Sequence, residues 1–164
     1  IMSTENMVFD EVEVGAELPE LAIEITPSTV VLGALATRDW RPMHHDKDFA
    51  QERNGTRHIF INTPHNAAYF ERYITDWTGP RGRLGKIQFR MSDSVFPGDT
   101  MIFHGKVEGK EVDEAGCGWI NLSIQLDVGD KVTTSCRARV AVPSATDDNP
   151  WKRKGDAWRP SPSS

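Results

Sequence analysis

The sequence is poor in cysteine, in long apolar runs and in surplus positive charge, and each shortage excludes a class of protein. Its 164 residues include 2 cysteines, Cys117 and Cys136, and neither lies in a disulfide or metal-binding motif. The longest apolar stretch, residues 30–36, is far shorter than the roughly 20 residues that cross a bilayer. The net charge of −5 leaves no basic footprint for nucleic acid. We therefore expect no membrane and no nucleic-acid partner.

Residues 2–6 are polar and lack the apolar core of a secretory signal peptide. We therefore expect a cytoplasmic protein with reduced thiols. At 164 residues the chain has the length of one domain and is long enough to bury a proper core.

The first half of the chain carries helix signals after one short strand. Apolar residues alternate over residues 21–25, which predicts a half-buried strand. Thr26-Pro27 is a helix entry, and the predicted helix runs to about residue 37. A shorter helical turn is predicted over residues 47–53. Thr63-Pro64 repeats the entry signal, and Thr63 is the predicted N-cap of the most apolar helix. The apolar stripe of this helix comprises Ala67, Phe70, Ile74 and Trp77, and Tyr69 and Tyr73 widen it.

The second half carries period-two patterns typical of strands. Apolar residues alternate over residues 87–91, 101–107, 120–128 and 132–140, with turn signals at 97–99 and 129–130. An early strand, a buried helix and then antiparallel strands is the element order of a hotdog fold. We predict an α+β protein with a single hotdog fold, in which an antiparallel sheet wraps a central helix at about residues 63–78.

Asp39 and His44 flank Pro42, which fixes its own φ and pushes Arg41 out of the helical region. The preceding helix must therefore stop near Asp39, and the turn displays His44 beyond it. A carboxylate and an imidazole on one rigid turn can face the same small volume, as acid/base chemistry on a bound water requires. Asp39 and His44 are the predicted catalytic pair.

Residues 39–44, read with Asp46 and Phe49-Ala50, resemble the motif of MaoC-like (R)-specific enoyl-CoA hydratases and dehydratases, Asp-x-Asn-Pro-(Ile/Leu)-His. The likeness covers about residues 9–142, including the turn at residues 96–99. It implies a hydro-lyase that adds water to a 2-enoyl-CoA or dehydrates an (R)-3-hydroxyacyl-CoA. Asp39 would act as base on water and His44 would donate the proton to C2, although the two roles could be exchanged. The resemblance implies no cofactor, because CoA is part of the substrate.

Arg41 stands where this family has Asn. It could face solvent, bind a CoA phosphate or a polar substrate group, or pair with Asp39 and lower the pKa of that carboxyl. The region at Asn62 and Thr63 replaces a His-Gly-Met stretch whose glycine amide binds the thioester oxygen in the family. Asn62 or Thr63 would then supply the oxyanion amide, unless Thr63 simply caps the helix. His65 is either packed and neutral or a substrate contact.

Two other groups of side chains could each bind a ligand or have another role. His45, with His58 and His65, could be considered for zinc or iron, but no recognised spacing links them and we predict no metal site. Arg81, Arg83, Lys86 and Arg90 could meet the CoA phosphates or protect a sheet edge against aggregation.

The resemblance also bears on assembly. We predict a MaoC-like hotdog domain at residues 1–142 and a C-terminal tail at residues 143–164, mobile or docked on a neighbouring subunit through Trp151 and Trp158. An open sheet edge predicts a homodimer, or a heterodimer or heterotetramer with a related hotdog subunit. Residues 62–65, together with residues 75–80, resemble MaoC-like proteins of steroid and fatty-acid side-chain degradation.

Two alternatives to the enzyme stay open. One is a non-catalytic CoA-binding hotdog subunit that supports a catalytic partner. The other is a thioesterase, which the hydratase motif disfavours. The presence of both Asp39 and His44 favours the enzyme.

Overall fold

The computed structural model describes residues 6–161, so the outermost parts of the predicted domain and tail, residues 1–5 and 162–164, lie outside the described residues. Antiparallel strands form a sheet in the order β1-β3-β4-β5-β2. The strands are β1 (Glu17–Glu24), β2 (Arg83–Met91), β3 (Thr100–Val112), β4 (Gly118–Val128) and β5 (Lys131–Val142). The α-helices are α1 (Pro27–Ala36), α2 (Lys47–Glu52) and α3 (Thr63–Thr78).

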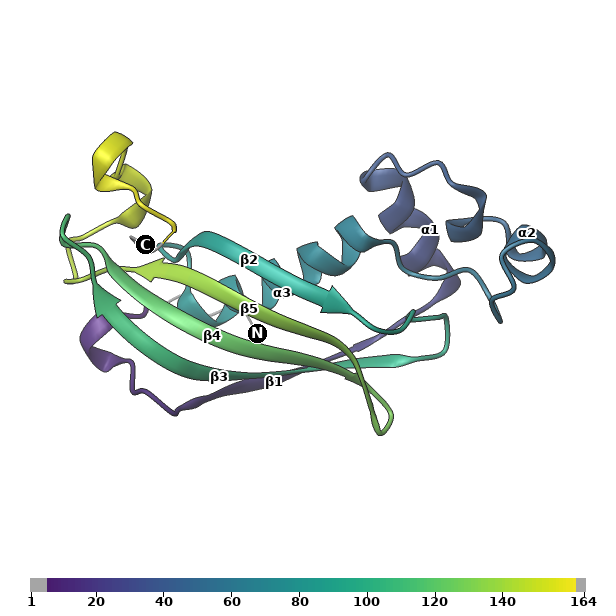
Figure 1. Cartoon of the computed structure of the whole chain (residues 1–164), viewed down its shortest axis with the longest axis horizontal. Helices are drawn as coiled ribbons and strands as arrows, with labels where there is room; N and C mark the ends of the chain where they lie inside the picture. The colour runs from purple at the N-terminus through teal and green to yellow at the C-terminus, as the bar shows by residue number, and fades with distance from the viewer. Residues whose placement is uncertain (1–5, 162–164) are drawn as a thin grey trace.

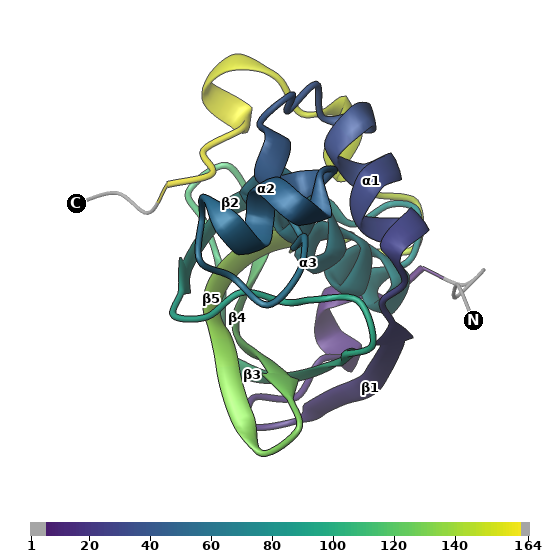
Figure 2. The same cartoon turned by 90° about the vertical axis from the view of Figure 1, so that its right-hand side faces the viewer.

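The sheet curves around α3, while α1 and α2 lie together beyond one end of the sheet (Figures 1 and 2). Phe70 of α3 is fully buried and meets Phe103 of β3 edge-on at 5.1 Å and Phe89 of β2 at 6.0 Å between ring centroids. The predicted α+β hotdog fold is confirmed. The buried face of α3 is narrower than the predicted stripe, because Ala67, Tyr69 and Trp77 are only half-buried.

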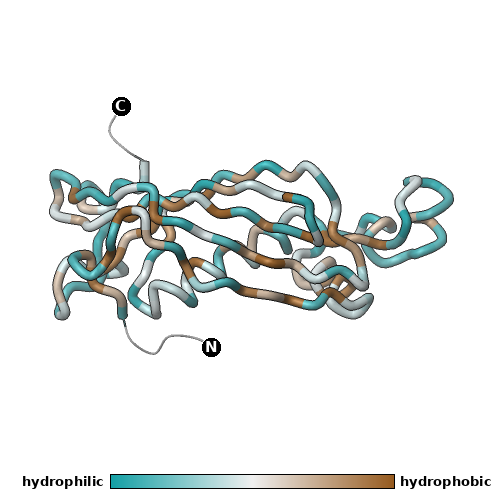
Figure 3. The backbone as a smooth tube through the Cα atoms, turned by 90° about the horizontal axis from the view of Figure 1, so that it is seen from below, coloured by the Kyte–Doolittle hydropathy of each residue, from teal (hydrophilic) through white to brown (hydrophobic). Residues whose placement is uncertain are grey.

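Side chains alternate across the sheet as the period-two patterns predict. Along β4, Ile120, Leu122 and Ile124 are buried against the helix layer. The residues between them are polar, and Figure 3 shows hydrophobic and hydrophilic positions alternating along the strands. The predicted turn at Gly129-Asp130 joins β4 to β5, with Gly129 at a φ of 60°.

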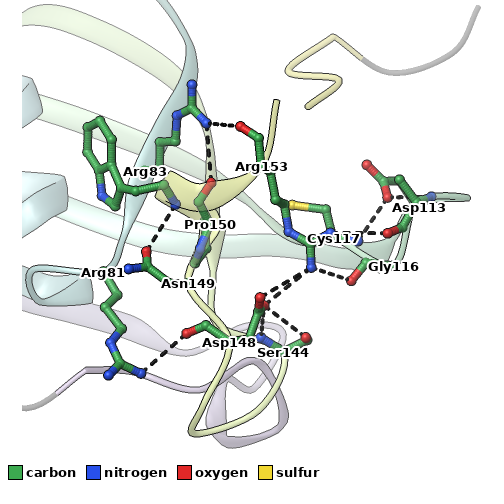
Figure 4. Close-up of polar contacts among 12 residues, drawn as sticks. Arg81, Arg83, Asp113, Gly116, Cys117, Ser144, Asp148, Asn149, Pro150 and Arg153 are labelled. Atoms are coloured by element: carbon green, nitrogen blue, oxygen red, sulfur yellow. Dashed lines mark hydrogen bonds and ion pairs between the residues drawn. The ribbon is translucent and has the colours of Figure 1, made fainter. Parts of the chain in front are cut away.

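The segment after β5 packs on the chain's own sheet. It contains two 3₁₀ turns, Pro150–Lys152 and Gly155–Ala157. The ring of Trp158 lies 4.9 Å from that of Trp119 in β4, and the guanidinium of Arg83 lies 3.6 Å from the Trp158 centroid. Arg153 donates to the carbonyl of Ala115 at 3.1 Å and to that of Gly116 at 3.0 Å, and Figure 4 shows the contact with Gly116. Trp158 thus packs within this chain, whereas Trp151 is 56% exposed. Docking of the tail on a neighbouring subunit stays a prediction.

Two of the four basic residues considered for CoA hold this same segment. Arg81 donates to the carbonyls of Thr146 and Asp148, and Arg83 donates to those of Pro150 and Arg153 at 3.2 and 3.0 Å (Figure 4). Because carbonyl oxygens take up these guanidinium donors, both arginines stabilise the tail.

Candidate functional site

The turn after α1 delivers the first predicted catalytic residue. Thr26 caps α1 by accepting from the amide of Thr29 at 3.1 Å, as predicted. The chain leaves the helix through Arg38, at a φ of 54°, and the amide of Asp39 donates to the carbonyl of Ala34 at 2.9 Å. Asp39 is thereby anchored to the last turn of α1.

Pro42 then starts a 3₁₀ turn over Pro42–His44, and this turn brings the imidazole back toward Asp39. His44 Nε2 lies 3.5 Å from Asp39 Oδ2. The His44 side chain is 3% exposed and that of Asp39 is 10% exposed. Asp46 caps α2 by accepting from the amide of Phe49 at 3.0 Å, which fixes the chain that leaves the turn. The structure therefore brings the predicted pair together in one place.

The other nitrogen of His44 decides which tautomer the neutral ring adopts. Nδ1 lies 2.8 Å from the carbonyl oxygen of Phe60. A carbonyl can only accept, so Nδ1 carries the hydrogen and the neutral ring keeps its lone pair on Nε2. Nε2 is buried and has no hydrogen-bond partner among residues 6–161. The lone pair is thus free to meet a water or a substrate.

Arg41 pairs with Asp39, which was one of the three alternatives for this residue. Nε donates to Oδ1 at 2.9 Å and Nη2 donates to Oδ2 at 2.8 Å, a forked contact. The Arg41 guanidinium is the main reason that the pKa of the Asp39 carboxyl lies well below its usual range. Burial raises the pKa of this carboxyl, whereas the hydrogen bond from the side-chain amide of Asn62 lowers it further. Asp39 is therefore a carboxylate at any physiological pH.

Asn62 joins the catalytic turn to the start of α3. Its Nδ2 donates to Thr37 Oγ1 at 2.7 Å and to Asp39 Oδ2 at 3.1 Å, while its Oδ1 accepts from the amide of His65 at 3.1 Å. Asn62 is thus the N-cap of α3, and the prediction of Thr63 as N-cap was wrong by one residue. The reason is that the extended backbone of Asn62, with ψ of 162°, aims its side chain at the first turn. Thr63 is the first helical residue.

His65 packs between α1 and Tyr69. Its ring stacks on Tyr69 with 4.6 Å between centroids, and it covers Gly33 so closely that a Cβ there would lie 1.9 Å from Nδ1. Burial lowers the pKa of His65, so the ring is neutral. Of the two alternatives for His65, this environment fits a packed, neutral ring and not a substrate contact.

Two contributors to this network were not identified in the sequence. Thr37 takes the Asn62 hydrogen bond, and Phe60 supplies a backbone carbonyl to His44. A hydroxyl at the end of a predicted helix was a weak signal for Thr37. No side-chain signal can reveal a backbone carbonyl 16 residues away from its histidine.

No cluster of three or more histidine, cysteine, aspartate or glutamate side chains within residues 6–161 is arranged to hold a metal ion. In the same part of the chain, no helix has both the length and the apolar character that a membrane span needs.

Comparison with proteins of known function places this geometry in context. The beta subunit of a 3-oxo-4,17-pregnadiene-20-carboxyl-CoA hydratase from Mycobacterium tuberculosis is 40% identical over 94 residues, which are 57% of this chain and 72% of the relative. The chain also superposes on a protein in the crystal structure of the ChsH1-ChsH2 complex from Mycobacterium tuberculosis. There the TM-score is 0.72, with 30% identity over 79% of this chain and 98% of that one.

The R-hydratase PhaJ1 from Pseudomonas aeruginosa shares the fold at a TM-score of 0.72 and 19% identity, over 85% of this chain and 88% of that one. Residues 11–123, which include Asp39, His44 and α3, match the MaoC like domain. The chain is a member of the MaoC-like domain family.

Proposed function

We propose that this chain is a hydratase that adds water to a 2-enoyl-CoA thioester, or dehydrates the matching (R)-3-hydroxyacyl-CoA. The observation that carries the proposal is the 3.5 Å approach of His44 Nε2 to Asp39 Oδ2 beside the start of α3. A water bound at His44 Nε2, beside the Asp39 carboxylate, can be activated for addition to C3.

The start of α3 supports the same proposal. The thioester becomes an enolate during addition, and its oxygen needs hydrogen-bond donors. The backbone N–H groups of Asn62 and Thr63 lie at the N-terminus of a 16-residue helix, and neither donates to a protein oxygen within residues 6–161. These amides, together with the positive end of the helix dipole, are the proposed oxyanion site. Proton transfer and amide donors suffice for this chemistry, so the proposal includes no metal and no redox cofactor.

A bulky apolar acyl group is the proposed substrate class. Trp40 follows Asp39 directly and is 65% exposed, and Leu32 and Leu35 on α1 are exposed as well. Exposed apolar side chains beside polar catalytic groups suit an acyl chain. The relative from Mycobacterium tuberculosis is named for a steroid-derived CoA thioester, which agrees with this choice.

We further propose that the chain works in the cytoplasm with a related hotdog subunit, as a heterodimer or heterotetramer; a homodimer is the alternative. β1 and β2 form the two edges of the sheet and each can pair with another strand. The similar chain in the ChsH1-ChsH2 structure is part of a complex of two proteins. Mass measurement of the chain expressed alone, and then with its candidate subunit, distinguishes these assemblies.

A second function, a non-catalytic supporting subunit, is favoured by the Arg41 fork, which weakens Asp39 as a base. Steady-state hydration of 2-enoyl-CoA separates the two functions. The enzyme predicts turnover that His44→Ala removes, whereas the supporting subunit predicts none from this chain's own pair.

A further inference from the structure

All the acceptor positions of the Asp39 carboxylate are occupied by donors of the protein. Oδ1 accepts from Arg41 Nε at 2.9 Å and from the Arg41 amide at 3.3 Å. Oδ2 accepts from Arg41 Nη2 at 2.8 Å and from Asn62 Nδ2 at 3.1 Å. A carboxylate offers about four lone-pair sites. Asp39 therefore cannot take a proton from water without breaking one of these contacts.

His44 has the opposite arrangement. Its Nδ1 hydrogen is committed to the Phe60 carbonyl at 2.8 Å, and its Nε2 lone pair has no partner within the described part of the chain. Nε2 is the only unoccupied acceptor of the Asp39–His44 pair. The Asp39 charge, 3.5 Å away, stabilises the ring once it is protonated.

We propose that Arg41 is a positioning residue that fixes Asp39 as a permanent anion and leaves His44 to carry out both proton transfers. The proposal rests on the hydratase function proposed above. It assigns Arg41 a task inside the site, in place of contact with a CoA phosphate.

The proton balance is complete with His44 alone. Nε2 takes a proton from water as the oxygen bonds to C3, and the C2=C3 electrons move into the thioester enolate. The imidazolium then gives that proton to C2 as the enolate returns to the thioester. Water has added across the double bond, His44 is neutral again, and Asp39 has not changed its protonation state.

The first test uses Arg41→Asn, because asparagine cannot span both carboxylate oxygens. The substrates are crotonyl-CoA and crotonyl-pantetheine, which lacks the nucleotide phosphates. We expect kcat to fall by about 100-fold on both substrates, with KM unchanged, because Asp39 loses its fixed position. Arg41→Lys should not restore kcat, since an ammonium group cannot make the fork.

Arg38→Asn is the matched control. It removes the same charge three residues away, and its φ of 54° is one that asparagine tolerates. We expect its kcat and KM to equal those of the wild type. A raised KM in Arg41→Asn for crotonyl-CoA only, with kcat retained, would show that Arg41 binds phosphate and would overturn the proposal. A kcat that rises in Arg41→Asn would overturn it as well.

A second comparison concerns the two acid/base candidates. Loss of a general base costs about 100-fold to 10,000-fold. We expect His44→Ala to lie in that range and Asp39→Asn to retain at least ten times more kcat than His44→Ala. The reverse order would assign proton transfer to Asp39 and refute the proposal.

The third test does not depend on turnover. Nitrogen NMR of the full chain should show the hydrogen of the His44 ring on Nδ1. Carbon NMR should show Asp39 titrating closer to the ordinary aspartate range in Arg41→Asn and unchanged in Arg38→Asn. A hydrogen on Nε2, or an Asp39 titration that ignores Arg41, would overturn the arrangement. These spectra together with an inactive wild type would refute the hydratase function and leave the Arg41–Asp39 arrangement standing.

Discussion

Gly33→Ala tests how α1 is held against α3. A helix-interior glycine replaced by alanine ordinarily stabilises a protein by about 0.5–1 kcal/mol. Here the new Cβ would lie 1.9 Å from His65 Nδ1 and 2.3 Å from Cε1, far inside a normal contact. Overpacking of this kind costs about 1–3 kcal/mol. The steric cost exceeds the propensity gain, so we expect a net loss of about 1 kcal/mol in the free energy of unfolding.

The same substitution should also reduce hydration. α1 must move away from α3 to admit the methyl group, and Asp39 is bonded to Ala34 on α1 while Asn62 starts α3. The 3.1 Å contact between Asn62 and Asp39 therefore lengthens, and kcat should fall by about tenfold or more.

Urea denaturation of four proteins provides the assay: wild type, Gly33→Ala, His65→Ala and the double variant. Removal of the ring opens space for the methyl group, so the double variant should be more stable than the sum of the single effects predicts. Gly109→Ala is the control, since a Cβ there meets no heavy atom within 4 Å. Additive effects, or a Gly33→Ala protein at least as stable as the wild type, would refute this account of the α1–α3 contact.

Three further predictions concern other parts of the chain. Asn62→Ala should lower the free energy of unfolding by about 1 kcal/mol, the usual cost of a lost N-cap, and reduce kcat, as denaturation and hydration assays will show. Burial raises the pKa of Cys117 to about 11 and that of Cys136 to about 12, so neither thiol should react with an aromatic disulfide reagent until the chain unfolds. Trp158→Ala should make Cys117 react first, because Trp158 packs against the buried cluster that contains Cys117. Because burial lowers the pKa of His65, the free energy of unfolding should be highest above the ordinary histidine pKa of about 6.5 and should decline as the pH falls below it. Unfolding experiments at several pH values should show that His65→Ala removes this decline.

The sequence was most informative where local chemistry decides the structure. Thr26-Pro27 and the alternation along β4 predicted elements that the structure contains, because caps and period-two patterns act over a few residues. The bounds of α3 were predicted, but its N-cap was displaced by one residue, since Asn62 and Thr63 are both good caps and only the backbone conformation decides between them. The packing of Trp158 on Trp119 could not be predicted, because it is a long-range contact that no local pattern encodes.

In the candidate site, too, the local features could be predicted from the sequence and the long-range contacts could not. Asp39 and His44 were predictable because one short turn places both. The fork from Arg41 was one of three alternatives, and the choice needed the side-chain geometry. The contacts with Thr37 and Phe60 depend on how α1, the turn and α3 pack together, which no local pattern encodes.

Hydration of crotonyl-CoA and of a longer 2-enoyl-CoA by the full chain tests the central claim most directly. Loss of enoyl absorbance would be followed for the wild type, Asp39→Asn and His44→Ala, each with its partner subunit when one copurifies and each checked for folding by circular dichroism. We predict turnover by the wild type, a reduced rate in Asp39→Asn and a rate at least about 100-fold below the wild type in His44→Ala. A His44→Ala protein that keeps the wild-type rate, or a folded wild-type assembly that hydrates neither substrate, would contradict the hydratase function.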